Sequence, residues 1–179
     1  MSISGFVGPK FDKTSGGVFA APPDMVGEIV TPDAMAPMDD RLWAPLGNEV
    51  YSRPLCLNVT EGYYVHMLWV KRPGLINRHR HTGQVHVLTL KGHWHYPEKD
   101  WAAGPGTYVF EPPGETHTLI VPEGGADMMF MAQVRGALQY VDETGRVIGF
   151  DDVFTRLDTA RLHYESVGLD PDILHRIIR

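Results

Sequence analysis

The chain has 179 residues, of which 43% are hydrophobic and 21% are charged, as in one globular domain of ordinary size. Its formal net charge of −6 and its lack of basic runs exclude the electrostatic pattern of a nucleic-acid-binding protein. The single cysteine cannot form an internal disulfide, and the sequence begins without a basic and apolar signal segment, so we expect a cytoplasmic protein. No apolar run approaches the roughly 20 residues that a membrane span needs.

Residues 1–49 are rich in Gly, Pro, Met and Asp and show little periodicity. We interpret them as an N-terminal arm, which either packs over a neighbouring subunit or forms a partly ordered tail. Over residues 50–150, short segments rich in Val, Tyr, Trp, Phe and Leu alternate with Gly/Pro turns. Strands at this spacing predict an all-β sandwich or barrel, and Glu143-Thr144-Gly145 is expected at the turn of its last hairpin.

The period changes over residues 151–179, where apolar residues recur every three or four positions. Asp151 or Asp152 can cap the start of this amphipathic helix, and Gly168 can end it. Asp170-Pro171 predicts the start of a short final helix. We therefore expect an arm over 1–49, a barrel over 50–150 and a C-terminal helical segment over 151–179 that packs on the barrel.

Six of the nine histidines fall between His79 and His117, which is the main compositional clue to function. Residues i and i+2 of a strand point to the same face, so His79 and His81 can bind one ion together if that face lines a barrel. His117 follows the rigid turn Pro112-Pro113-Gly114, which can aim a third imidazole. A lone His-x-His pair is a weak signal, because His93-Trp94-His95 repeats the pattern and strand histidines often face water.

The spacing of these residues resembles the two sequence signatures of the cupin superfamily. The first signature matches from His79-Arg80-His81 to Gly92, although its leading glycine stands one residue too close. The second matches over residues 106–117 and departs from the pattern only at Val121, where the signature has asparagine. The resemblance implies an all-β fold with a single cupin (jelly-roll) barrel.

The first signature also has a metal-binding glutamate, and that position is Val85 in this chain. Strict alternation points the neighbouring His86 to the opposite face, unless a β-bulge turns it inward. We therefore expect a metal site made by His79, His81 and His117 alone, with no protein carboxylate. Imidazole suits Fe, Zn, Cu and Ni, so the ligand type leaves the metal open. Three neutral ligands would leave the ion its full positive charge and open positions for an oxygen-chelating substrate and O₂.

The segments 79–119 and 151–169 more closely resemble the bacterial 2,4'-dihydroxyacetophenone dioxygenase family, with similarity from about Trp43 to Gly168. Members of that family use non-haem iron and O₂ to split an aromatic 2-hydroxyketone into a benzoic acid and formate. The resemblance implies an Fe(II) cofactor, with Zn as the alternative, and a small aromatic hydroxyketone as the partner with O₂. It also implies a homodimer or homotetramer.

Trp94 and Tyr96 lie between the two signatures and can stack on an aromatic substrate, although barrel core or subunit interface explains such aromatics equally well. Glu98 is a candidate substrate-binding residue. Glu98 or Glu111 could orient a hydroxyl or act as a base, but we expect both to be solvated loop carboxylates.

Gln84 and His86 are candidates for contacts that fix the tautomer of a ligand histidine. The sequence does not identify a catalytic acid or base. Two other functions stay open: a redox-neutral metal cupin, such as an isomerase or hydrolase, and a zinc-binding cupin sensor. An isomerase would work without O₂, whereas a dioxygenase would stop.

Overall fold

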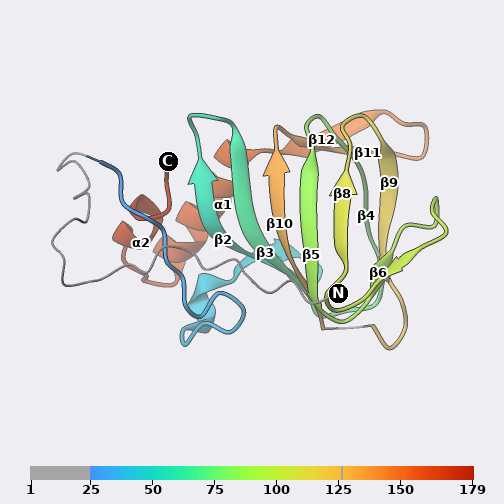
Figure 1. Ribbon diagram of the computed structural model, residues 1–179. Helices are drawn as coiled ribbons and strands as arrows, with labels where there is room; N and C mark the ends of the chain where they lie inside the picture. Colours follow the sequence, from blue (N-terminus) through green and yellow to red (C-terminus); the bar gives the residue numbers. More distant parts are fainter. Residues whose placement is uncertain (1–24, 126) are drawn as a thin grey trace, which may run out of the picture.

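The computed structural model describes residues 25–125 and 127–179, so the first 24 residues of the expected arm lie outside it. Two six-stranded antiparallel sheets face each other (Figure 1). The first has the order β1-β2-β3-β10-β5-β8, and the second has the order β12-β11-β4-β9-β6-β7. The expected all-β jelly-roll barrel is confirmed.

The first sheet contains β1 (Ala44–Gly47), β2 (Val50–Asn58), β3 (Tyr63–Val70), β10 (Met128–Arg135), β5 (Val85–Lys91) and β8 (Tyr108–Glu111). The second contains β12 (Val147–Asp151), β11 (Leu138–Val141), β4 (Gly74–His81), β9 (Thr116–Val121), β6 (Trp94–His95) and β7 (Ala102–Ala103). The expected hairpin turn is present, with Gly145 at a φ of 83° and the Asp142 carboxylate accepting from the Thr144 backbone N–H.

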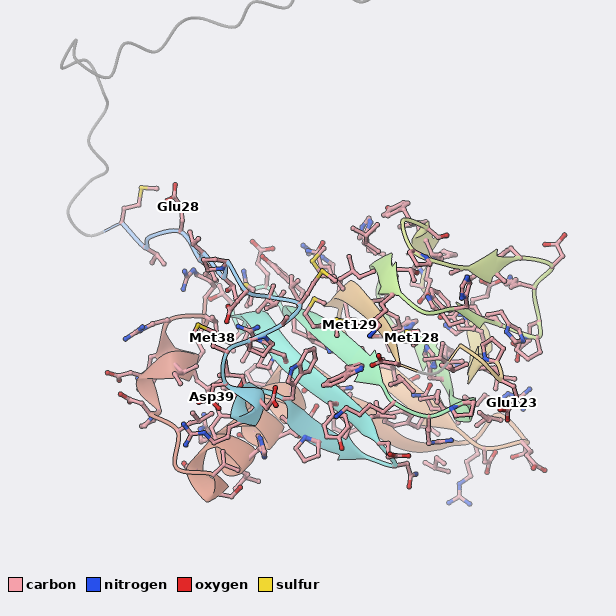
Figure 2. The ribbon with its side chains drawn as sticks, turned by 90° about the horizontal axis from the view of Figure 1, so that it is seen from below. Glu28, Met38, Asp39, Glu123, Met128 and Met129 are labelled. Atoms are coloured by element: carbon pink, nitrogen blue, oxygen red, sulfur yellow. The ribbon has the colours of Figure 1, made fainter. Side chains whose placement is uncertain are left out.

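The strands show the alternation that sorts side chains between the two faces of a sheet. Met128 and Met129 are neighbours on β10 (Figure 2), yet they belong to different clusters. Met128 is fully buried in the main core between the sheets, whereas Met129 packs with Trp43 and Met67 on the other face of the first sheet. The main core therefore lies between the sheets, and a small apolar cluster covers one outer face.

The C-terminal segment forms α1 (Val153–Ser166) and α2 (Asp172–His175). Asp152 caps α1 in a capping box, because its carboxylate accepts from the backbone N–H of Thr155 while the Thr155 hydroxyl accepts from the Asp152 N–H. Helix α1 contacts β1, β2 and β12 and buries one apolar side on them. The C-terminal helix thus covers one end of the barrel. Among the described residues, no helix is long and apolar enough to cross a membrane.

The described part of the N-terminal segment runs along one flank of the barrel between Glu28 and Asp39 (Figure 2). The buried guanidinium of Arg53 holds it there by donating to the backbone oxygens of Asp33 and Ala34. A 3₁₀ turn, η1 (Asp40–Leu42), then leads into β1, which pairs with β2. The first sheet therefore begins within the segment 1–49 that the sequence suggested as an arm.

Candidate metal centre

Three buried histidines meet on the inner face of the second sheet. His79 and His81 lie two residues apart on β4, and His117 lies directly opposite His79 on the neighbouring strand β9. The Nε2 atom of His79 is 3.0 Å from Nε2 of His81 and 3.0 Å from Nε2 of His117. All three side chains are at most 4% exposed. The structure therefore brings together the three histidines selected from the sequence, although their role as metal ligands stays a prediction.

The tautomer of His79 follows from the hydrogen bond that its second ring nitrogen, Nδ1, makes. Nδ1 lies 2.7 Å from the Asn77 side-chain oxygen, which can only accept, so Nδ1 carries the proton. Asn77 is two residues before His79 on β4 and shares its face. Burial lowers the pKa of His79 well below its ordinary value, with a smaller contribution from His81 and His117, so the ring is neutral. Its Nε2 therefore presents a lone pair, which needs a donor or a cation as its partner.

A carboxylate completes the cluster, and the expectation that no carboxylate enters the site is wrong. Glu111 is buried rather than solvated, and its Oε2 atom lies 3.0 Å from Nε2 of His81 and 3.6 Å from Nε2 of His117. Glu111 ends β8 and pairs directly with Val85 on β5. Val85 is the position where the cupin signature has its glutamate. The neighbouring strand β8 thus supplies a carboxylate next to position 85, where this chain lacks the glutamate of the cupin signature.

The charge of the cluster suits a cation. Burial raises the pKa of Glu111, but hydrogen bonding and charge from His81, with smaller contributions from His117 and Tyr96, bring it below the ordinary value. Glu111 is therefore ionised at neutral pH. Burial lowers the pKa of His117 in spite of the opposing effect of Glu111, so this ring too is neutral at neutral pH. An anionic carboxylate beside imidazole nitrogens is a typical donor set for a divalent transition metal.

The spacing of the donor atoms also fits a metal ion. His79, His81, Glu111 and His117 can each offer one donor atom, and these four atoms lie within 4.8 Å of one another. An ion about 2.1 Å from two imidazole nitrogens, at roughly right angles, separates those nitrogens by about 3.0 Å. The Nε2 separations of 3.0 Å around His79 match this value. The four residues can therefore hold a metal ion.

Tyr96 holds the carboxylate and one histidine in place. Its hydroxyl donates to Oε1 of Glu111 at 2.5 Å, which leaves Oε2 directed at the histidines. Its ring stacks on His117 with the centroids 4.0 Å apart and the planes 5° from parallel. Trp94 packs beside Tyr96 at 5.1 Å between centroids, and its indole N–H donates to Thr89. Both aromatic residues are buried inside the barrel, so their predicted role in substrate binding requires contact from within the cavity.

The cluster opens into a cavity of about 200 Å³ between the two sheets. His79, His81, Glu111, Trp94 and Tyr96 line part of it, and most of the remaining lining is aliphatic or aromatic. This volume lies below the roughly 300–1,000 Å³ of typical ligand pockets, so it suits a compact ligand. An apolar wall with a few convergent polar groups is characteristic of a small-molecule site.

The other candidate residues lie outside this cluster. Glu98 is partly exposed, and its carboxylate accepts from the backbone N–H and the hydroxyl of Thr118. Gln84 and His86 contact each other, and Nδ1 of His86 lies 2.7 Å from the Tyr108 hydroxyl. The structure thus gives Gln84 and His86 no contact with the three buried histidines, and Asn77 makes the tautomer-fixing contact that we expected of them.

The sequence did not place two residues in this site: Asn77 was not singled out, and Glu111 was expected to be a solvated loop carboxylate. Asn77 carried a usable signal, because it stands at i−2 from His79 and i−4 from His81 and must share their face if the strand begins early enough. The signal for Glu111 was weaker. It required the pairing of two predicted strands, Val85–Lys91 with Tyr108–Glu111, in the register that sets Glu111 beside Val85.

A comparison with protein families matches residues 31–136, more than half of the chain, to the ChrR cupin-like domain. A comparison with curated proteins finds no match.

Solved structures support the same fold. An RmlC-like cupin protein from Ralstonia eutropha JMP134 is 29% identical, with a TM-score of 0.68 over 72% of this chain and 85% of that one. A second Ralstonia eutropha JMP134 protein, of unknown function and with a cupin-like fold, is 21% identical, with a TM-score of 0.64 over 68% of this chain and 76% of that one. An acetylacetone dioxygenase from Acinetobacter johnsonii is 16% identical, with a TM-score of 0.63 over 78% of this chain and 99% of that one.

Proposed function

The chain belongs to the ChrR cupin-like domain family, and we propose that it is a non-haem iron dioxygenase that cleaves a carbon–carbon bond in a small aromatic 2-hydroxyketone. The observation that carries this proposal is the group of three imidazole nitrogens and one carboxylate, of which His79, His81 and Glu111 line a compact, largely apolar cavity. The fold similarity to an acetylacetone dioxygenase is consistent with oxygen chemistry on a small oxygen-chelating ketone.

His79, His81 and His117 would hold the iron, with Glu111 beside them. Iron(II), when bound, would supply the redox chemistry that allows O₂ to react with a chelated hydroxyketone. For 2,4'-dihydroxyacetophenone and one O₂, the balanced products are one 4-hydroxybenzoate and one formate, as the acids. Both oxygen atoms are incorporated and no external reductant is consumed.

The protein side chains account for the binding and proton steps. Trp94 and Tyr96 border the cavity and provide apolar ring surface for an aromatic ligand. Oε2 of Glu111 is ionised, buried and free of the Tyr96 hydrogen bond, so it can accept the proton of the substrate hydroxyl.

Oxygen uptake by the iron-loaded protein tests this proposal. With 2,4'-dihydroxyacetophenone we expect uptake of one O₂ for each formate released, no turnover without O₂, and no turnover by His117→Ala after the same treatment with iron. Turnover of a ketone under strictly anaerobic conditions would show that the protein is a redox-neutral enzyme and not a dioxygenase. Absence of O₂ uptake on every hydroxyketone, in protein with full iron occupancy, would overturn the proposal.

A zinc-binding role is the second candidate, and Glu111 is the observation that favours it. Three histidines and one carboxylate make four protein ligands, the number that closes a structural zinc site. Because zinc binds most such sites more tightly than Fe(II), the two metals are loaded separately. Stoichiometric zinc binding, together with no O₂ uptake by the fully iron-loaded protein on any hydroxyketone, would favour a zinc-binding protein.

A further inference from the structure

A second polar cluster lines the same cavity and has no part in the metal centre. It consists of Tyr64 on β3, Tyr140 on β11 and Arg156 on α1. Tyr140 is the direct cross-strand neighbour of His79, so the cluster begins one strand away from the histidines. Tyr64 and Arg156 line the same cavity as His79 and His81, so a ligand in that cavity can face both clusters.

The guanidinium of Arg156 is only partly satisfied. Its Nη2 atom pairs with Oδ2 of Asp151 at 2.8 Å, but Nε and Nη1 have no hydrogen-bond partner among the described residues. The Tyr64 hydroxyl is likewise buried without a partner in hydrogen-bond geometry, although it lies close enough to the Arg156 guanidinium for the two side chains to shift each other's pKa. Arg156 is 6% exposed and Tyr64 is 1% exposed, so bulk water does not replace the missing partners. Buried polar groups are almost always paired, so unpaired donors beside a cavity point to a ligand.

The position of Arg156 in the helix supports a role beyond packing. The buried side of α1 consists of Val153, Leu157, Ala160 and Tyr164, and Arg156 is the one charged residue among them. A long charged side chain in an apolar helix face is rarely fully buried unless it is paired. Only part of this guanidinium is paired by the protein, which leaves donors available on the cavity side.

The charges of the cluster select the kind of ligand group. Asp151 already balances the charge of Arg156 and also accepts a hydrogen bond from the Tyr140 hydroxyl. The adjacent His66 is buried and contacts the Ser52 hydroxyl, and burial together with Arg156 keeps its pKa well below the ordinary value, so it is neutral. A full anion would therefore enter a cluster without net positive charge. An uncharged oxygen that accepts hydrogen bonds fits the unpaired donors better.

We propose that Arg156 and Tyr64 form a distal subsite that binds an uncharged oxygen, such as a phenolic hydroxyl, on a ligand whose other end lies at the metal centre. This inference rests on the proposed function for the position of the ligand, and it adds the two residues that would select a ring carrying a polar oxygen remote from the ketone. The subsite would select against the unsubstituted ring, because that ring leaves the buried donors unpaired.

Calorimetry on the full-length iron-loaded protein without O₂ tests this subsite, because it measures binding apart from turnover. The probes are 2,4'-dihydroxyacetophenone, 2-hydroxyacetophenone and 4-(2-hydroxyacetyl)benzoate. We expect the dihydroxy compound to bind at least tenfold more tightly than either of the others. Tyr64→Phe removes one unpaired hydroxyl, and Arg156→Lys keeps the charge but removes the planar donors. Both variants should reduce the tenfold preference, because they weaken the binding of the dihydroxy compound and lessen the penalty that unpaired donors impose on 2-hydroxyacetophenone. Tyr63→Phe, the next residue on β3, is the matched control.

Equal binding of the first two probes, or binding of neither, would overturn the subsite. A preference that survives in both variants would do the same, and tighter binding of the benzoate would overturn the choice of an uncharged oxygen. Failure of the proposed function alone would give a different result. The wild-type protein would still bind the dihydroxy compound more tightly and Tyr64→Phe would still lose this preference, but no O₂ would be consumed when air is admitted. If Arg156→Lys does not fold, Tyr64→Phe alone decides the outcome.

Discussion

The chain contains the pattern His-x-His twice, and the two copies lie in opposite environments. His79-Arg80-His81 is on β4, where the histidines face the barrel interior and Arg80 binds Gln139. In His93-Trp94-His95 the phase is reversed, because Trp94 is buried in the core and His93 is exposed. Spacing alone therefore does not make a metal site. The face of the strand on which the pair falls decides its role.

The largest effect is expected when the inward-facing histidines are removed. His79→Ala, His81→Ala or His117→Ala should each abolish stoichiometric metal binding and O₂ uptake together, because the three imidazoles supply three of the four possible donor atoms. Elemental analysis of the purified variants measures the metal, and circular dichroism checks that each variant is folded. Full metal content in any of the three variants would show that the histidine replaced in it is not a metal ligand.

Glu111→Gln should have the next largest effect. The substitution keeps the shape of the side chain but removes the negative charge that lies 3.0 Å from His81. We expect metal affinity and O₂ uptake to fall by about 100-fold, since conserving the geometry does not conserve the charge. Tyr96→Phe is the matched comparison, because it removes only the hydrogen bond to Oε1. Unchanged affinity and rate in Glu111→Gln would show that the carboxylate has no part in the site.

Asn77→Ala should have a smaller effect. It removes the oxygen that accepts from Nδ1 of His79 and so frees the ring to change tautomer. Loss of such a supporting contact typically costs about 10- to 100-fold in metal affinity or activity, and we expect the lower end. Titration with a chelator measures the affinity. Asn77→Asp restores an acceptor oxygen and should recover the affinity; failure to recover would contradict a tautomer role.

His93→Ala should leave metal content and O₂ uptake unchanged, which makes it the control for the whole comparison. His93 is exposed and packs beside Gly104, away from the buried cluster. Metal loss in this variant would mean that the pairs have been assigned the wrong way round.

The sequence predicted the barrel and the convergence of three histidines because both depend on local information. Alternating apolar residues define the strands, and the spacing of His79, His81 and His117 defines the signatures. Glu111 and Arg156 were not predicted because their environments come from tertiary structure. Glu111 looked like a loop residue before two prolines, and its burial depends on pairing with Val85. Nothing in the helical pattern singles out Arg156, and only the packing of α1 against the barrel buries it.

An anomalous difference map from crystals of the metal-loaded protein tests the central claim most directly. The account predicts one strong peak within bonding distance, roughly 2.0–2.2 Å, of the Nε2 atoms of His79, His81 and His117. A peak coordinated instead by His93 or His95, or a metal-loaded crystal with no peak beside β4, would contradict it.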